Sequence, residues 1–281
     1  MHLLLLTVLT MIAFAGNSVL NRLALAGAAI DPASFALIRT IAGAAMLSVL
    51  VVLRGNGANL RSRPDHWAVL SLVIYMIGFS YAYVTLDAGI GALILFGVVQ
   101  VTMFAGAIVR GNRVPKTRWL GAGIAFAGLV YLLWPSGGGS APSLFGAALM
   151  IPAAVGWGVY SLRGQMAADP LTATALNFNY AVAFVAVVFV LAAGQYITAG
   201  GAILAILSGA VTSGLGYALW YAILPRLEAT VAAVAQLTVP IIAMAGGMVF
   251  LAEAPDQRFW IAAILVVSGV LISLIKRDAH K

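Results

Sequence analysis

The stretch DPASFALIR, residues 31–39, recurs in altered form as DPLTATALN, residues 169–177. Chance identities are common at single positions, but three further landmarks recur in the same order, each about 140 residues downstream. They are GFSYA from Gly78 as GLGYA from Gly214, Gln100 as Gln236, and Pro115 as Pro255. The shared order and spacing indicate an internal repeat. We therefore divide the chain into a first unit, residues 1–140, and a second unit, residues 141–281.

Composition places this repeat in a membrane. The chain is 63% hydrophobic and only 8% charged, with a mean hydropathy of +1.06, and these values exclude a soluble domain. A bilayer core is crossed by a helix of roughly 20 apolar residues. Ten such runs are present: 3–25, 32–53, 67–86, 90–109, 117–134, 144–162, 171–192, 201–223, 229–251 and 258–275.

The number of runs in each unit sets their relative orientation. Five helices are an odd number, so the second unit enters the membrane from the opposite side to the first. The sequence therefore predicts an all-α integral membrane fold with ten transmembrane helices, arranged as two inverted five-helix repeats around a central cavity. Substrate sites of such carriers lie near the midplane, between the repeats.

Basic residues orient the bundle. A net charge of +7 would suggest a nucleic-acid partner in a soluble chain, but here Lys and Arg gather in alternate short gaps. They are Arg54, Arg61 and Arg63; Arg110, Arg113, Lys116 and Arg118; Arg163; Arg226; and Lys276, Arg277 and Lys281, with Arg258 the main exception. Cytoplasmic loops keep such residues. We therefore expect both termini in the cytoplasm, a multi-pass location in the cell inner membrane, and no nucleic-acid partner.

Several motifs resemble a known family. The DP…R opening at residues 31–39, WGVY at 157–160 and the long segment YALWYAILPRLEATVAAVAQLTVPIIAMAGGMVFLAEAP at 217–255 are similar to the EamA branch of the drug/metabolite transporter superfamily. The resemblance covers the whole chain, and YddG-type amino acid exporters look closest. It implies that helices 117–134 and 258–275 are peripheral and that amino acids or related metabolites are exported. Phe104 and Arg113 depart from the family pattern that Pro240 and Glu253 follow.

Arg39 is the most informative charged residue, because it lies roughly 10 Å below one end of the run 32–53 at 1.5 Å per residue. A guanidinium at depth costs about 2.5–3.5 kcal/mol, so it should face protein or a watery cavity. Two interpretations remain open. Arg39 could clamp helix-end carbonyls or Asp31, or it could bind a substrate carboxylate. Asn177 stands at the matching place of the second copy and joins the predicted substrate-binding residues.

Gln100 and Gln236 both approach the membrane midplane, and Pro240 follows the second of them by four residues. Because proline lacks an N–H group, it cannot donate to the carbonyl of Gln236, which leaves an acceptor for a ligand. We predict that the two glutamines line the substrate site and that Pro240 is a hinge. The alternative is hydrogen bonding between helices, worth around 0.6 kcal/mol on average.

Aromatic residues supply candidate cavity walls. Most Trp and Tyr side chains of membrane proteins anchor helix ends at the interface, which suits Trp67, Trp119, Trp134 and Trp260. A deeper group suits the walls of a cavity for an amphipathic small molecule: Tyr75, Tyr81, Tyr83, Trp157, Tyr160, Tyr217, Trp220 and Tyr221. Of these, five are predicted to bind substrate: Tyr81, Trp157, Tyr160, Tyr217 and Tyr221.

The stretch MIAFAGNSVLNRLAL, residues 11–25, places polar residues in the first apolar run. AFA before Gly16 resembles a signal-peptide cleavage site, but cleavage would remove the repeat partner of residues 144–162, so we expect the run to be retained. Asn17 and Asn21 lie one turn apart on the same face and are predicted to line the translocation path. Arg22 reaches the interface, where we predict a snorkelling anchor.

The chemistry available argues for passive transport. All eight acids map to loops or helix ends, which disfavours a carboxylate-based proton antiporter, and no P-loop is present. The chain has no Cys and three peripheral His residues, so neither a metal, a cofactor nor an enzyme site is expected. The predicted function is export of neutral or aromatic amino acids or related metabolites by alternating access and facilitated diffusion. The alternatives are a translocase of a lipid-linked sugar and a drug or metabolite efflux pump of other specificity. Partners are a small-molecule substrate and membrane lipid; the oligomeric state stays open, a monomer included.

Overall fold

The computed structural model describes residues 2–109, 115–134, 142–227 and 235–274. Within these ranges the chain is helical, apart from an isolated antiparallel bridge between Ile30 and Ile197. Six helical segments are long and apolar enough to cross a membrane. They are α1 (His2–Ala26), α2 (Pro32–Leu53), α4 (Ala88–Val109), α6 (Leu144–Gly164), α7 (Pro170–Leu191) and a continuous segment made of α8 (Ala199–Leu207), η2 (Ser208–Leu215) and α9 (Gly216–Ile223).

Four further helices are apolar but shorter: α3 (His66–Ala82), α5 (Lys116–Leu133), α11 (Val239–Leu251) and α12 (Gln257–Leu274). Short 3₁₀ turns, η1 (Gly57–Arg61) and η3 (Leu224–Arg226), follow α2 and α9. The predicted run 67–86 is shorter than expected, because α3 ends at Ala82 and a turn follows. The predicted run 229–251 is interrupted at Leu237 and Thr238, and residues 229–234 of it lie outside the described part of the chain.

The recurring aspartates begin helices in both halves. Asp31 accepts a hydrogen bond from the backbone N–H of Ser34 (2.9 Å), and Asp169 accepts one from the N–H of Thr172 (3.3 Å). In each case a proline follows at the first helical position. The carboxylate satisfies an N–H group that has no partner inside the helix, and proline is tolerated there because its missing N–H is not needed.

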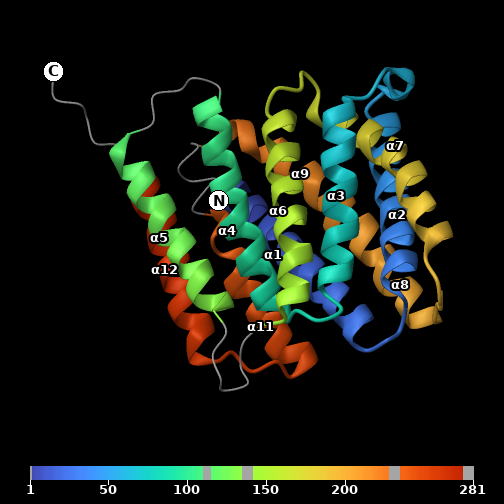
Figure 1. The fold of residues 1–281 in the computed structure, drawn as a ribbon. Helices are drawn as coiled ribbons and strands as arrows, with labels where there is room; N and C mark the ends of the chain where they lie inside the picture. Colours follow the sequence, from blue (N-terminus) through green and yellow to red (C-terminus); the bar gives the residue numbers. More distant parts are fainter. Residues whose placement is uncertain (1, 110–114, 135–141, 228–234, 275–281) are drawn as a thin grey trace, which may run out of the picture.

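The helices pack as a bundle in which distant parts of the chain meet. α5 lies against α12 at one edge, and α2 lies against α7 towards the other (Figure 1). Between them α3 packs on α6, α4 contacts both α6 and α11, and α1 contacts α11 and the α8–η2–α9 segment. Small residues permit close contact between α5 and α12: a methyl group on Gly269 would lie 2.6 Å from the backbone nitrogen of Ala125.

Candidate functional site

Asn17 lies at the centre of a buried polar network. Its Nδ2 donates to the hydroxyl of Tyr75 (3.2 Å), while its Oδ1 accepts from Ser208 (2.7 Å) and Thr212 (3.1 Å). Asn21, one turn further along α1, donates to the backbone carbonyl of Asn17 (2.8 Å) and to Ser208 Oγ (3.2 Å). Both asparagines are at least 96% buried. The predicted polar stripe of α1 therefore faces protein, towards α3 and η2.

Arg39 extends this network from α2. Its side chain is fully buried; Nη2 donates to the Tyr75 hydroxyl (2.9 Å) and Nε to Ser213 Oγ (3.4 Å). The guanidinium carbon lies 4.9 Å from the ring centre of Phe79 and 5.2 Å from that of Tyr75, distances typical of cation–π contacts. Nη1 is buried without a hydrogen-bond partner. Among the described residues, the hydrogen-bond partners of the guanidinium are Tyr75 and Ser213 rather than Asp31 or a helix-end carbonyl, so the clamp considered from the sequence is not formed there.

The serine and threonine partners come from an unusual helix. Residues Ser208–Leu215 are π-helical, with i→i+5 bonding inside an otherwise α-helical segment. Such π segments are rare and often occur at functional sites. This one packs on α2 so closely that a methyl group on Gly209 would press on the backbone carbonyl of Arg39. The glycine therefore allows the hydroxyl groups of η2 to reach the side chains of α1 and α2.

An aromatic cluster lies beside the polar network. Trp157 of α6 lies 5.0 Å, centre to centre, from Tyr75, 4.8 Å from Tyr217 and 5.7 Å from Tyr160. Phe14 packs edge-on against Trp157 at 6.2 Å. The cluster also includes Phe79, Phe178 and Trp220. It joins both halves of the chain, and Tyr75 belongs to the cluster and to the polar network at once.

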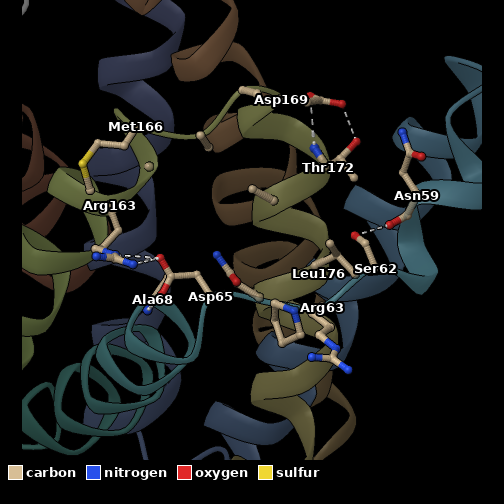
Figure 2. Close-up of a pocket in the computed structure, with 16 residues that line it drawn as sticks. Asn59, Ser62, Arg63, Asp65, Ala68, Arg163, Met166, Asp169, Thr172 and Leu176 are labelled. Atoms are coloured by element: carbon tan, nitrogen blue, oxygen red, sulfur yellow. Dashed lines mark hydrogen bonds and ion pairs between the residues drawn. The ribbon is translucent and has the colours of Figure 1, made fainter.

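A pocket of about 460 Å³ opens where α2 ends and α3 begins, between the end of α6 and the start of α7. Asn59, Asp65, Arg163, Asp169 and Asn177 are among the residues that line it. In Figure 2, Arg163 points towards Asp65, with which it forms an ion pair at 2.6 Å. Asn177 is 95% buried at its inner wall.

The opposite end of the bundle is closed by ion pairs. Arg22 Nε lies 2.9 Å from Glu253 Oε1, and Arg22 Nη2 lies 3.0 Å from Asp87 Oδ1. The prediction that Arg22 is a snorkelling anchor is therefore wrong, because two carboxylates from separate loops hold it within the protein. Glu253 also accepts from the N–H of Ala88, which begins α4. Burial raises the pKa of Glu253, and the hydrogen bonds from Arg22 and Ala88 only partly offset that rise.

Hydrogen bonds between two loops lie near these ion pairs. The carboxylate of Asp31 accepts from the backbone N–H of Tyr196 (2.9 Å), and the Thr198 N–H donates to the carbonyl of Ala29 (3.0 Å). Together with the bridge between Ile30 and Ile197, these bonds join the α1–α2 loop to the α7–α8 loop. Burial raises the pKa of Asp31, but the hydrogen bonds from Ser34 and Tyr196 outweigh it and hold the pKa below its ordinary value.

Of the predicted substrate-binding residues, the structure brings Asn17, Asn21, Arg39, Trp157, Tyr160 and Tyr217 into or beside one buried centre. Asn177 lines the pocket and lies beside the hydroxyl of Tyr160. The others lie differently. Tyr81 is half-buried one residue before the end of α3, Tyr221 packs its hydroxyl against Gly164, and Gln100 and Gln236 are half-buried on their helices. Pro240 occupies the first turn of α11, directly after the interruption at residues 237 and 238.

Sequence reasoning missed several participants. Tyr75 belonged to the deeper aromatic group, but Tyr81 was preferred to it; Tyr75 stands in the middle of α3, whereas Tyr81 lies one residue before its end. Ser208 and Ser213 gave none, since small hydroxyl residues are common in membrane helices that merely pack together. Glu253 follows the end of α11 and resembled an ordinary loop acid, so its ion pair with Arg22 could not be anticipated.

Taken together, these elements define a multi-pass helical membrane protein with a buried polar and aromatic centre. The chain belongs to the EamA-like transporter family, whose sequence profile matches residues 2–134 and again residues 144–275. Members of this family are transporters rather than enzymes.

Individual relatives agree with this assignment. An uncharacterized protein of Pseudomonas aeruginosa is 46% identical over 98% of this chain and 95% of its own length. A probable amino-acid metabolite efflux pump of Salmonella typhimurium is 26% identical over 67% of this chain and 68% of its own length. The chain is also similar to a solved structure titled only as the crystal structure of a protein. The TM-score is 0.64 and the sequence identity 20%, over 95% of this chain and 96% of the other. This similarity supports the fold alone.

Proposed function

We propose that this protein exports amino acids or related small metabolites across the inner membrane by facilitated diffusion, with both termini in the cytoplasm. The observation that carries the proposal is the buried centre: one arginine, two asparagines and several hydroxyl groups lie against an aromatic cluster. Sparse polar groups with aromatic walls suit a small amphipathic molecule. The efflux pump of Salmonella typhimurium adds support for this substrate class.

Two observations support inverted repeats. The family profile matches the chain twice, once in each half. The contacts between helices also follow such a symmetry. It relates α1 to α5, in order, to α6, α7, the α8–η2–α9 segment, α11 and α12. The contact of α3 with α6 then becomes that of α1 with α8 and α9, and the contact of α4 with α6 becomes that of α1 with α11. The pairs α2–α7, α4–α11 and α5–α12 map onto themselves.

The two ends of the bundle differ in a way that suits alternating access. With the proposed orientation, the pocket lined by Asn177 opens to the cytoplasm, while Arg22, Glu253 and Asp87 close the outer end. Substrate would enter this pocket and reach the aromatic cluster at Tyr160 and Trp157. Rocking of the two halves would then open the outer end and close the inner one. The described helices hold no carboxylate away from their ends, which favours a substrate gradient as the driving force.

Counterflow in proteoliposomes tests the proposal. The purified protein is loaded with excess unlabelled amino acid, and the entry of labelled amino acid is followed with and without a proton gradient. We expect counterflow that does not depend on the proton gradient. Tyr217→Ala should abolish it while leaving a folded, monodisperse protein, and Trp67→Ala, which alters an exposed helix-end aromatic, should not.

The outcomes separate the alternatives. Movement of lipid-linked sugars with no movement of any amino acid or related acid would replace the proposal with a lipid translocase. Strict dependence on the proton gradient would overturn facilitated diffusion while leaving the substrate class intact.

A further inference from the structure

Arg39 is a buried cation without a counter-charge among the described residues. Six of the eight acids lie in the described part of the chain, and each is engaged elsewhere. Asp31, Asp169 and Asp256 accept from helix N–H groups, Asp65 pairs with Arg163, and Asp87 and Glu253 pair with Arg22. The neighbours of the Arg39 guanidinium are neutral: Tyr75, Phe79 and Ser213.

This arrangement is costly in electrostatic terms. A buried charge is normally paired, because desolvation is repaid only by an opposite charge and by saturated hydrogen bonds. Tyr and Ser hydroxyl groups and the faces of two aromatic rings stabilise the guanidinium in part. Nη1 remains buried without a partner, although buried polar groups nearly always have one. Within the described part of the chain, the polar centre therefore carries one unit of uncompensated positive charge and one donor without a partner.

We propose that Arg39 binds the carboxylate of the substrate, and that the transporter prefers net-anionic monocarboxylates with an apolar or aromatic body over zwitterionic amino acids. The inference rests on the proposed function and narrows its substrate class. A carboxylate supplies the missing charge and accepts from Nη1, and Arg is the residue best suited to planar carboxylate recognition.

The ammonium group of an amino acid finds no opposite charge among the described residues of this centre. Arg39 donates to the neutral hydroxyl groups of Tyr75 and Ser213. From Tyr75 the network continues to the neutral side chains of Asn17, Asn21, Ser208 and Thr212, and no described acid is hydrogen-bonded to them. A zwitterion would place its positive end in a site that is already positive. The aromatic cluster, with Trp157 and Tyr217 at its centre, instead accommodates an apolar ring or chain.

Three probes with the same phenyl body test the charge preference. They are 3-phenyllactate (a carboxylate without ammonium), phenylalanine (both groups) and phenethylamine (ammonium alone). In wild-type proteoliposomes we expect uptake in that order, with phenyllactate at least about tenfold above phenethylamine, a factor that corresponds to about 1.4 kcal/mol. Net-anionic transport moves charge, so an inside-positive potential should speed phenyllactate uptake and leave phenylalanine uptake unchanged.

Variants then connect the preference to Arg39. Arg39→Gln should remove phenyllactate uptake and its response to potential, and Arg39→Lys should restore part of both. Arg258→Gln is the matched control, because Arg258 also stacks on a tyrosine and has a buried Nη1 without a partner, but lies at the α5–α12 edge. It should transport normally. Melting temperature and gel filtration establish that each variant is folded.

The wild-type measurements test the proposed charge preference even if the Arg39 variants fail to fold. Equal uptake of all three probes, or no response of phenyllactate to potential, would overturn the inference and leave amino acid export standing. Faster uptake of phenethylamine than of phenyllactate would do the same. Folded wild-type protein that moves none of the probes and no amino acid would overturn the proposed function and this inference together.

Discussion

Asn17 shows how much a single polar side chain can connect inside a membrane bundle. Its amide group contacts Tyr75 on α3 and both Ser208 and Thr212 on η2, so three elements share one residue. Each such bond contributes only about 0.6 kcal/mol on average in a membrane. The stronger consequence is orientation, because one amide fixes which atom of each partner donates and which accepts.

Replacement of Asn17 by Leu should therefore abolish counterflow and lower stability by about 1–3 kcal/mol, because Ser208 and Thr212 lose a buried acceptor. Thermal unfolding in detergent and counterflow measure the two effects. Ser48→Ala provides the control, since Ser48 hydrogen-bonds Asn179 on an exposed face. Unchanged transport in Asn17→Leu would contradict a role for the network in substrate passage.

At the scale of elements, the aspartates that begin α2 and α7 each contact the other half. Asp31 accepts from Tyr196 beyond α7, and Asp169 accepts from Asn56 beyond α2 (3.4 Å). Asp31 thus caps α2 and holds the loop after α7, and Asp169 caps α7 and contacts the loop after α2. Because the folded pKa of Asp31 is lowered, its stabilising contribution is present above the ordinary value of 3.8 and is lost as the pH falls through the lower, folded value.

Asp31→Asn should keep the cap but remove this titration, since Asn caps helices as well as Asp does. Melting temperatures are compared from neutral pH down to below 3.8. We expect wild-type protein to lose its advantage over the Asn variant only at the acidic end. Asp31→Ala should lower the free energy of unfolding by about 1 kcal/mol at every pH above this acidic end. A pH-independent difference between wild type and Asp31→Asn would contradict the lowered pKa.

The close crossing of η2 and α2 depends on Gly209. A methyl group there would press on the Arg39 carbonyl and lie 2.8 Å from Cβ of Ala42, so Gly209→Ala should destabilise the fold by about 1–3 kcal/mol. It should also displace Arg39 and reduce transport. Gly123→Ala on α5 is the matched control, since nothing lies within 4 Å of its new methyl group. Equal melting temperatures and equal transport rates of the two variants would contradict a contribution of this close contact to stability.

At the scale of the whole molecule, the two ends of the bundle are held by different ion pairs. Arg22 joins Asp87 and Glu253 at one end, and Arg163 joins Asp65 at the other. The proposed alternating access requires that the first set opens when substrate leaves. The chain contains no cysteine, so single cysteines can report this opening without background labelling.

Arg22→Gln should favour the outward-open state, because it removes both ion pairs at the outer end. The reporter is a cysteine at the buried position Ser80, reacted in intact cells with a membrane-impermeant maleimide. Labelling should increase severalfold over the same reporter with Arg22 intact. Arg163→Gln breaks the ion pair of the opposite end and should produce no increase. Equal labelling in all three backgrounds would show that Arg22 does not close the outer end.

Some residues of the buried centre could be predicted from the sequence, and others could not. Asn17, Asn21 and Arg39 were identifiable because polar groups at depth in an apolar run are expensive and must find partners. Their serine partners were not, since Ser208 and Ser213 become distinctive only when η2 is placed against α1 and α2. Arg22 was misjudged for the same reason: Glu253 lies 231 residues away in the chain.

The sequence by itself determined that the chain is a membrane-embedded helical protein and where most of its helices lie, because the length of an apolar run and its terminating residues are local properties. It also indicated a repeat, since similar folding units keep similar landmarks at similar spacing, and the family profile matches the chain twice. Only the tertiary structure decided which polar atoms meet. A hydrogen bond or ion pair needs atoms within about 3 Å, and that depends on how each helix is rotated and crossed, which no run of hydrophobic residues specifies.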